Sequence, residues 1–145
     1  MILNSFDILL ACVLYIVEGL HREFLRAGAD VMQAFTFYAS DDKLDNRGNA
    51  ANTKYTGSAI NKRAAELAKK VADEGDALTL GGICQCPTYL SGASKEAVQE
   101  EFRKQIKVFV EAGLDFLLCE VTLKKTPLFE CPLNTVPAPL KAALE

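Results

Sequence analysis

Short apolar runs alternate with amphipathic helical segments along most of this chain, and this alternation limits the possible fold more than any other feature. Strands are expected at residues 31–37, 76–83 and 115–121, where apolar side chains dominate. Strands separated by helices of this length form βα units with a parallel sheet. Strands this apolar suit a parallel sheet, because both of its faces are usually covered. The sequence therefore predicts an α/β fold.

Helix-capping residues and glycines mark the segments between the strands. Three helices are expected, and each is followed by a glycine that can end it: Gly28, Gly75 and Gly113. Thr56 or Ser58 can cap the second helix, and Ser94 can cap the third. Apolar residues recur at helical spacing within each segment, which predicts one buried face per helix.

Residues 8–17 form an unbroken apolar run, ILLACVLYIV. A membrane-spanning helix needs about 20 such residues, so this run is too short to cross a bilayer. A secretory signal carries positive charge ahead of its apolar segment, whereas the first basic residue here is Arg22. We therefore expect the start of a buried helix in a cytoplasmic protein. A signal peptide is the alternative interpretation.

Length, charge and motifs narrow the classes of function. A chain of 145 residues corresponds to one domain, and its net charge of -3 argues against a general nucleic-acid binder, which needs a basic face. A doubly wound sheet and a (β/α)8 barrel both fit the alternation. Neither G-x-G-x-x-G nor G-x-x-x-x-G-K-[ST] is present, so a nucleotide-binding fold would lack its phosphate turn.

The cysteine and histidine contents limit metal and nucleophilic chemistry. Five cysteines at irregular spacing are not typical of a disulfide framework. Cys84 and Cys86 form a C-x-C pair, which fits either a small thiol or metal-binding module or alternate small residues at a strand end. His21 is the only histidine, which nearly excludes a catalytic triad or a multi-histidine metal site. We expect it at the surface of its helix.

Residues that handle ligands in parallel α/β folds gather at the carboxyl ends of the strands. Three groups occupy such positions: Phe37 with Tyr38, Gly82 with Ile83, and Cys119 with Glu120. A carboxylate such as Glu120 is costly to bury after an apolar strand unless a positive group pairs with it. An exposed acid at a strand end is the alternative, and the residues alone leave both open.

Three segments carry a resemblance to a known family: LHREFLRAGADVMQAFTFYASDDKLDNRG, VADEGDALTLGGICQCPTYLS and DFLLCE. Through them, residues 20–121 resemble the homocysteine S-methyltransferase family, and within it the betaine-using members. The resemblance implies a (β/α)8 TIM barrel that transfers a methyl group from a donor such as betaine to the thiolate of homocysteine, giving methionine. It also implies zinc as the family's cofactor, which holds that thiolate.

The same resemblance implies roles for individual residues. Tyr38 matches a family tyrosine that lines the active site and helps to hold the methyl donor, with Phe37 and Thr36 beside it. An aromatic wall suits a quaternary ammonium group, because a ring face attracts a cation. Glu120 matches the family glutamate that binds the amino group of homocysteine. Segment 41–48 becomes an active-site loop, in which three residues match the family wording: Asn46, Arg47 and Gly48.

The chain also departs from the family pattern. Val121 stands where betaine-using members have an aromatic residue, which leaves the identity of the methyl donor open. The family's zinc cysteines lie in turns such as G-V-N-C and G-G-C-C-G, and neither turn is present. We therefore assign no catalytic residue and no metal ligand, and we expect this chain to hold no zinc.

We expect three regions: a divergent apolar segment at 1–19, a partial homocysteine-binding barrel domain at 20–121, and a divergent tail at 122–145 with four of the five prolines. About three parallel strands with three helices cannot close a barrel, so open sheet edges favour self-association. Two functional interpretations follow. The chain is a truncated methyltransferase, inactive alone, or a non-catalytic truncated or spliced product that associates with a full-length subunit. No nucleic acid and no membrane is expected as a partner.

Overall fold

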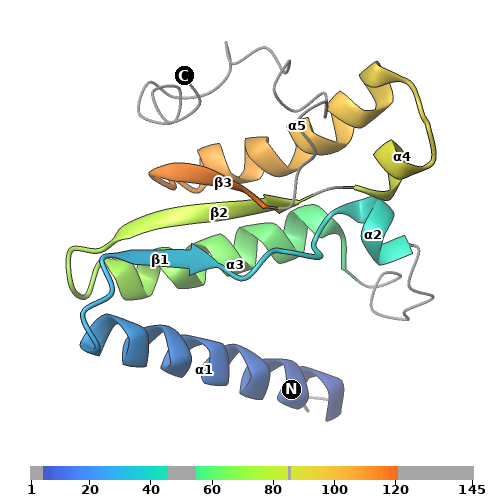
Figure 1. Cartoon of the computed structure of the whole chain (residues 1–145). Coiled ribbons are helices and arrows are strands. Elements are labelled where there is room, and N and C mark those ends of the chain that lie inside the picture. The colour runs from blue at the N-terminus through green and yellow to red at the C-terminus, as the bar shows by residue number, and fades with distance from the viewer. Residues whose placement is uncertain (1–4, 46–54, 85, 121–145) are drawn as a thin grey trace.

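Three parallel strands form one unclosed sheet in the computed structural model, which describes residues 5–45, 55–84 and 86–120 (Figure 1). The strands lie in chain order across the sheet: β1 (Val31–Ala34), β2 (Leu78–Cys84) and β3 (Phe116–Glu120). Three long helices are α1 (Ser5–Arg26), α3 (Gly57–Ala72) and α5 (Lys95–Glu111), and two short ones are α2 (Asp41–Asp45) and α4 (Pro87–Leu90). The predicted α/β architecture with a parallel sheet is confirmed.

The expected helix ends are also present. The hydroxyl oxygen of Thr56 accepts a hydrogen bond from the Ala59 N–H, and that of Ser94 accepts one from the Ala97 N–H. Each bond satisfies a backbone donor that has no partner inside its helix. Gly113 has a φ of 70°, in the left-handed region that favours glycine after a helix. These local signals explain where α3 and α5 begin and where α5 ends. After α3 the positive φ, 58°, falls at Asp76 and not at the predicted Gly75.

The helices cover one face of the sheet. Register pairs Met32 with Thr79 and Ala34 with Gly81, and the side chains at the first three of these positions are almost fully buried. They face α3 and α5, the two helices that pack against the strands. Residues of the opposite parity point away. Leu78 and Leu118 are 51% and 42% exposed there, whereas Leu80 is 7% exposed.

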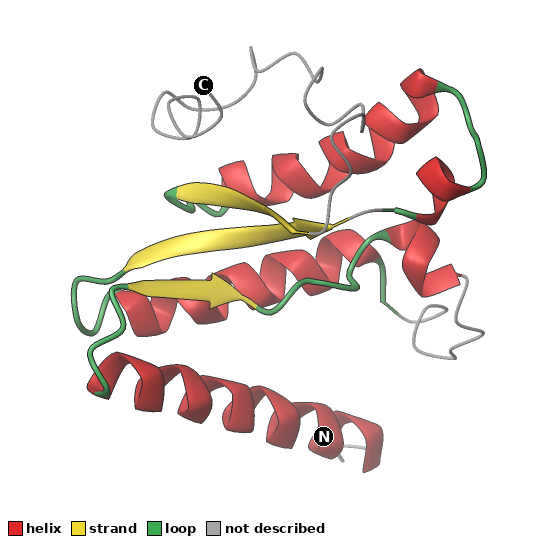
Figure 2. Ribbon diagram, in the orientation of Figure 1, coloured by secondary structure: helices red, strands yellow, loops and turns green. Residues whose placement is uncertain are grey.

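The opposite face is thus exposed at Leu78 and Leu118 and buried at Leu80, so the expected cover on both faces is met only in part. Crossovers between parallel strands are right-handed, and the strand order runs in one direction across the sheet. Both crossover helices consequently fall on the same side. Figure 2 shows the helices and strands of this arrangement.

The N-terminal helix α1 is not buried over residues 13–17, the part of the apolar run whose side chains the structure describes. Three side chains in this part are exposed: Val13, Tyr15 at 76% and Ile16 at 66%. Polar contacts join α1 to α3 and the turn that follows it: Lys70 pairs with Glu18, and the Arg22 guanidinium pairs with Glu74. The prediction of burial is therefore wrong for residues 13–17, while Leu25 further along α1 does pack against the core.

Two boundaries differ from expectation. The first strand ends at Ala34, not at residue 37. The chain turns instead, with the Ala39 N–H donating to the Thr36 carbonyl oxygen at 3.1 Å, and the expected loop at 41–48 begins as the short helix α2. The tail at 122–145 lies outside the described residues. None of the described helices is long and apolar enough to cross a membrane.

Gly81 is expected to be essential for packing of β2. A Cβ atom there would lie 2.7 Å from the Phe109 ring, and that ring is fully buried, so it cannot move aside. We predict that Gly81→Ala lowers the free energy of unfolding by about 1–3 kcal/mol, measured by urea denaturation.

Gly19→Ala provides the matched control for this change. Gly19 lies inside α1, and nothing stands within 4 Å of the position a Cβ would take. Alanine should stabilise that helix by up to about 1 kcal/mol. Equal effects of the two substitutions would contradict the packing argument.

Candidate substrate-binding site

The carboxyl ends of the three strands meet along one edge of the sheet. The Thr36 hydroxyl lies 3.0 Å from the Gly82 carbonyl oxygen, which joins the chain after β1 to β2. Cys84 lies opposite Glu120 in the register of β2 and β3. The structure thus brings the predicted site residues of two different strands to the same edge, with β2 between them.

Thr36 has a supporting position within this edge. It is 2% exposed, and its hydroxyl can donate to the carbonyl oxygen of Gly82 at 3.0 Å or of Ala34 at 3.2 Å. A hydroxyl has one proton, so these two carbonyl groups share it. Thr36 therefore holds the turn that presents the next two residues.

Phe37 and Tyr38 form an aromatic pair in that turn. Their ring centroids lie 4.8 Å apart, with the planes 80° apart in an edge-to-face arrangement. The Lys43 ammonium lies 4.7 Å from the centroid of the Tyr38 ring and 5.1 Å from that of Phe37. It also donates to the Phe37 carbonyl oxygen at 3.1 Å. Tyr38 remains 54% exposed, whereas Lys43 is 8% exposed.

Lys43 was not among the site residues predicted from the sequence. Its neighbours Asp41 and Asp42 made it resemble one charge of a solvated loop. The available signal was the spacing: a lysine five residues after Tyr38, at a point where a short helix returns the chain, can lie over the ring.

Two carboxylates fix helix α2 in place beneath the aromatic pair. Asp41 accepts from the Gly57 N–H at 2.6 Å, which joins α2 to the start of α3. Asp42 accepts from the N–H and the hydroxyl of Thr88 in α4, at 3.0 Å and 2.7 Å. Burial acts to raise the pKa of Asp42, but hydrogen bonds outweigh it and hold that pKa below its ordinary value. The carboxylate is therefore charged at neutral pH.

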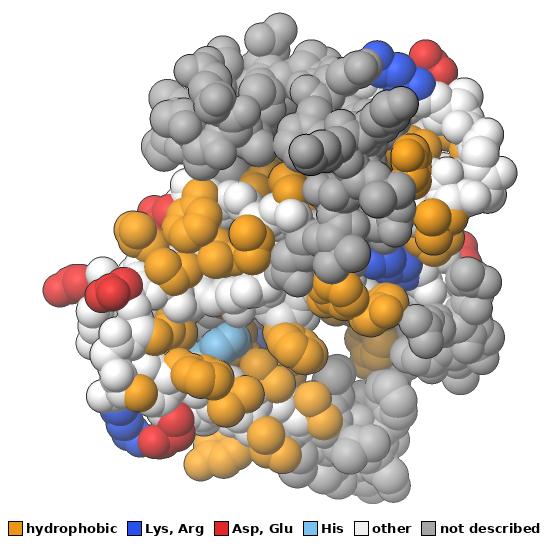
Figure 3. Space-filling model, in the orientation of Figure 1, with side chains coloured by type: hydrophobic (Ala, Val, Ile, Leu, Met, Phe, Trp, Pro, Cys, Tyr) orange, Lys and Arg blue, Asp and Glu red, His pale blue; other side chains and the backbone are white. Residues whose placement is uncertain are grey.

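A hollow of about 820 Å³ extends from this turn along β1 towards α1. Apolar side chains dominate its lining, including Leu20, Phe24 and Phe35, and the aromatic pair lies at one end. Figure 3 shows hydrophobic side chains around the histidine on this side of the molecule. Leu20 and Phe24 of α1 face this hollow, whereas no residue of the predicted apolar run 8–17 is among its lining residues.

His21 is buried at this hollow, so the prediction of a surface histidine was wrong. It is 9% exposed, and its Nε2 lies 3.1 Å from the carbonyl oxygen of Gln33 in β1. Burial lowers the pKa of His21, although the hydrogen bond to Gln33 acts in the opposite direction. Nδ1 is buried and has no hydrogen-bond partner among the described residues, so Nε2 carries the proton and donates it.

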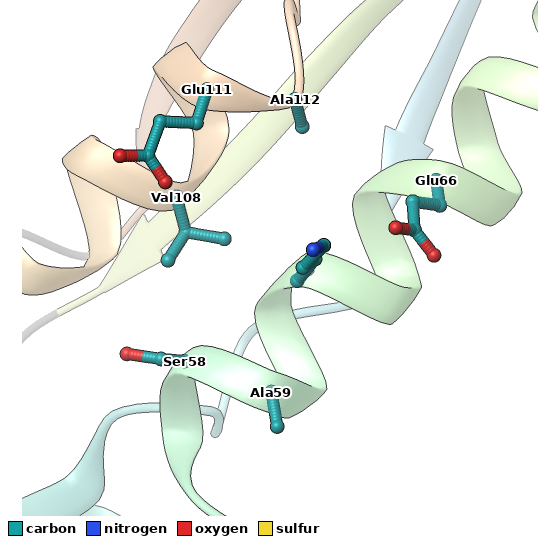
Figure 4. A pocket seen from close by; sticks show the side chains of 7 residues that line it. Ser58, Ala59, Glu66, Val108, Glu111 and Ala112 are labelled. Atoms are coloured by element: carbon teal, nitrogen blue, oxygen red, sulfur yellow. The ribbon is translucent and has the colours of Figure 1, made fainter.

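A second hollow, of about 370 Å³, lies between α3 and α5 (Figure 4). Ser58, Glu66, Val108 and Glu111 are among its lining residues. None of the predicted site residues lines it, and it lies in the helix layer. We therefore place the candidate site at the strand ends.

The remaining predicted residues fall at or beyond the limits of the described chain. Glu120 is the last residue of β3, and its side chain lies outside the described part. Asn46, Arg47 and Gly48 lie outside the described residues altogether.

The described side chains do not form a metal centre. No group of three or more His, Cys, Asp or Glu residues among them could hold a metal ion. Cys86 is buried and Cys119 half-buried, and burial raises the pKa of both thiols, which opposes the thiolate form that binds metal.

A one-directional parallel sheet, with helices on one side and the site at its carboxyl edge, defines the class of βα-repeat proteins to which (β/α)8 barrels belong. The family model described as homocysteine S-methyltransferase matches residues 3–127. The chain belongs to the homocysteine S-methyltransferase family.

Curated relatives agree with this assignment. Betaine–homocysteine S-methyltransferase 1 of Xenopus tropicalis is 57% identical over 104 residues, which cover 72% of this chain and 26% of that protein. The Sus scrofa protein of the same name is 55% identical over 104 residues, covering 72% of this chain and 37% of its own length. The chain thus spans well under half the length of these relatives.

Solved structures show the same fold. The metallated form of the homocysteine methyltransferase MmuM from Escherichia coli matches with a TM-score of 0.66 at 24% identity, over 89% of this chain and 52% of that one. The oxidised form matches equally well, with a TM-score of 0.66 at 23% identity. The partial, unclosed barrel expected from the sequence is thereby confirmed.

His21 predicts a pH dependence of stability. Its pKa is lowered in the folded state, so the unfolded chain binds more protons near and below the ordinary value of 6.5. Stability should therefore be full above that value and fall as the pH drops below it, until the folded-state pKa is passed. Thermal unfolding between about pH 7 and pH 5 measures this effect.

His21→Gln is the control, because its amide can still donate to the Gln33 carbonyl but does not titrate. Asp42 and Asp115, whose pKa values are lowered, titrate below this window. The variant should show a flatter profile than the natural chain. Identical slopes would contradict the assignment to His21.

Proposed function

We propose that this chain handles the two substrates of homocysteine S-methylation, a methyl donor such as betaine and homocysteine itself. The match of the family model over residues 3–127 carries this proposal. The position of the aromatic turn and of Glu120 at one sheet edge supports it, since ligands bind at that edge in folds of this class.

In the proposed reaction the homocysteine sulfur forms a bond to a methyl carbon of the donor. The bond from that carbon to the donor nitrogen breaks, and its electron pair stays on the nitrogen. Methionine and the demethylated amine are the products. The reaction needs a sulfur nucleophile, and a free thiol with a pKa of about 8.5 is mostly protonated at neutral pH.

The proposed roles follow the resemblance to the family. Tyr38 and Phe37 supply an aromatic wall for the quaternary ammonium group of the donor, and Thr36 positions them. Glu120 pairs with the ammonium group of homocysteine. We propose that the loop containing Asn46, Arg47 and Gly48 borders the site. Residues 20–121 form the substrate-handling domain of this proposal.

Zinc would supply a stabilised thiolate in the family, but the described residues do not fit such a site. The proposed reaction of this chain therefore contains no zinc-dependent step. We propose that these 145 residues hold no zinc and carry out little or no methyl transfer alone. The limited span relative to the curated relatives supports this view. The irregular cysteine spacing supports a reducing compartment, and we place the protein in the cytoplasm.

A second candidate function is non-catalytic. The chain would then be a truncated or spliced product that associates with a full-length subunit of the family. The exposed apolar face of the sheet favours this candidate, because Leu78 and Leu118 are left half-exposed there. Co-purification with a full-length family member would support this candidate, and failure to bind it would remove it.

Binding of homocysteine tests the proposed function without requiring turnover. We expect calorimetry to detect binding to the natural chain, and Glu120→Gln to weaken it by roughly tenfold to a hundredfold, since a charge-assisted pair is lost. Glu111→Gln removes an exposed carboxylate of α5 and should leave binding unchanged. Equal affinity in all three proteins would contradict the role of Glu120. A parallel assay with betaine and homocysteine measures any methyl transfer.

Self-association through the open sheet is a further expectation. We predict concentration-dependent association in sedimentation velocity, reduced by Leu118→Lys on the open face, because a charge there must be desolvated on contact. Leu90→Lys changes an exposed leucine of α4, away from the strands, and should not reduce association. A monomer at every concentration would refute this expectation.

A further inference from the structure

The Lys43 ammonium already occupies the kind of position that a cationic ligand of the aromatic pair would take. Its nitrogen lies 4.7 Å from the centroid of Tyr38 and 5.1 Å from that of Phe37. Attraction between a cation and a ring face operates within about 6 Å of the centroid. Both rings therefore have a cation supplied by the chain itself.

Several contacts hold Lys43 in this place. Its ammonium donates to the Phe37 carbonyl oxygen at 3.1 Å, and the residue is 8% exposed. Its helix is fixed on both sides, by Asp41 to the start of α3 and by Asp42 to Thr88 in α4. This is a built arrangement, unlike that of a solvated surface lysine such as Lys62 in α3, which is exposed.

We propose that Lys43 is a specificity-determining residue of this site, whose ammonium is the resident cation of the Phe37–Tyr38 pair and must be displaced before an organic cation can bind there. A second cation beside the same rings would meet a like charge, which opposes binding. The proposal rests on the proposed function only for the identity of that cation as the methyl donor. A donor with a quaternary ammonium group would then bind in competition with Lys43.

Tetramethylammonium is the probe for this competition, titrated as its chloride into the full chain at constant ionic strength. Lys43→Gln removes the charge and should bind tetramethylammonium at least about tenfold more tightly than the natural chain, a difference of about 1.4 kcal/mol. Lys62→Gln is the matched control, with the same change of charge at an exposed site, and should bind as the natural chain does. Equal or weaker binding by Lys43→Gln overturns the proposal.

The double variant Lys43→Gln/Tyr38→Leu tests whether the gain uses the ring. Its affinity should return to that of the natural chain or fall below it, because the aromatic face is gone. A gain that persists without Tyr38 overturns the proposal, since the added binding would then come from elsewhere. No homocysteine is present in these titrations, so a failure of methyl transfer or of homocysteine binding leaves their outcome unaffected.

Loss of the hydrogen bond from Lys43 could prevent folding, so circular dichroism accompanies each variant, and Lys43→Met provides a second neutral variant with a similar stem. A measurement on the natural chain covers the case in which neither folds. The ε-methylene protons of Lys43 should resonate upfield because they lie over the rings, and they should move towards exposed-lysine values as tetramethylammonium is added. Lys43 resonances that stay unchanged throughout the titration overturn the proposal.

Discussion

The hand of the strand crossovers is the constraint on which the rest of this structure depends. Each helix that joins two neighbouring parallel strands must cross on the same side, and the strand order here never reverses. Met32, Thr79 and Ile83 therefore share one buried layer against α3 and α5. The same constraint leaves Leu78 and Leu118 on a face with no crossover helix. The buried layer on one face and the exposed leucines on the other are thus both consequences of the right-handed crossovers.

The candidate site depends on a second layer of organisation, made of hydrogen bonds. β1 ends at Ala34, and the chain beyond it would be free to move without further contacts. Thr36 bonds to Gly82, and the short helix α2 is tied to α3 and α4 through Asp41 and Asp42. A helix of five residues has little stability of its own, so these bonds determine where it lies. They also place a lysine over two rings.

The parts of the fold that sequence reasoning predicted are those governed by local chemistry. Caps at Thr56 and Ser94 and the glycine at Gly113 act within a few residues, so the helices followed from the sequence. The burial of His21 could not be predicted in this way, because it depends on how α1 lies against β1. There the His21 Nε2 contacts the carbonyl oxygen of Gln33, twelve residues away. The predicted burial of the apolar run in α1 was wrong for the same reason, because it too depends on contacts with distant parts of the chain. An apolar run shows that burial of its surface would be favourable, but it does not show whether another element covers that surface.

The candidate site was also predictable from the sequence only in part. Tyr38 and Glu120 were found through family wording, and the structure places the backbone of each near the carboxyl edge, on either side of β2. Neighbouring strands lie about 4.8 Å apart, so the two outer strands are separated by roughly 10 Å at the backbone. In the proposed function, a donor beside the first outer strand and an amino acid beside the other would meet over β2. Gly81 and Gly82 lie next to each other in the middle of β2. Gly81 admits the Phe109 ring on the helix side. Gly82, of the opposite parity, carries no side chain, so β2 places none between the two outer strands at that position.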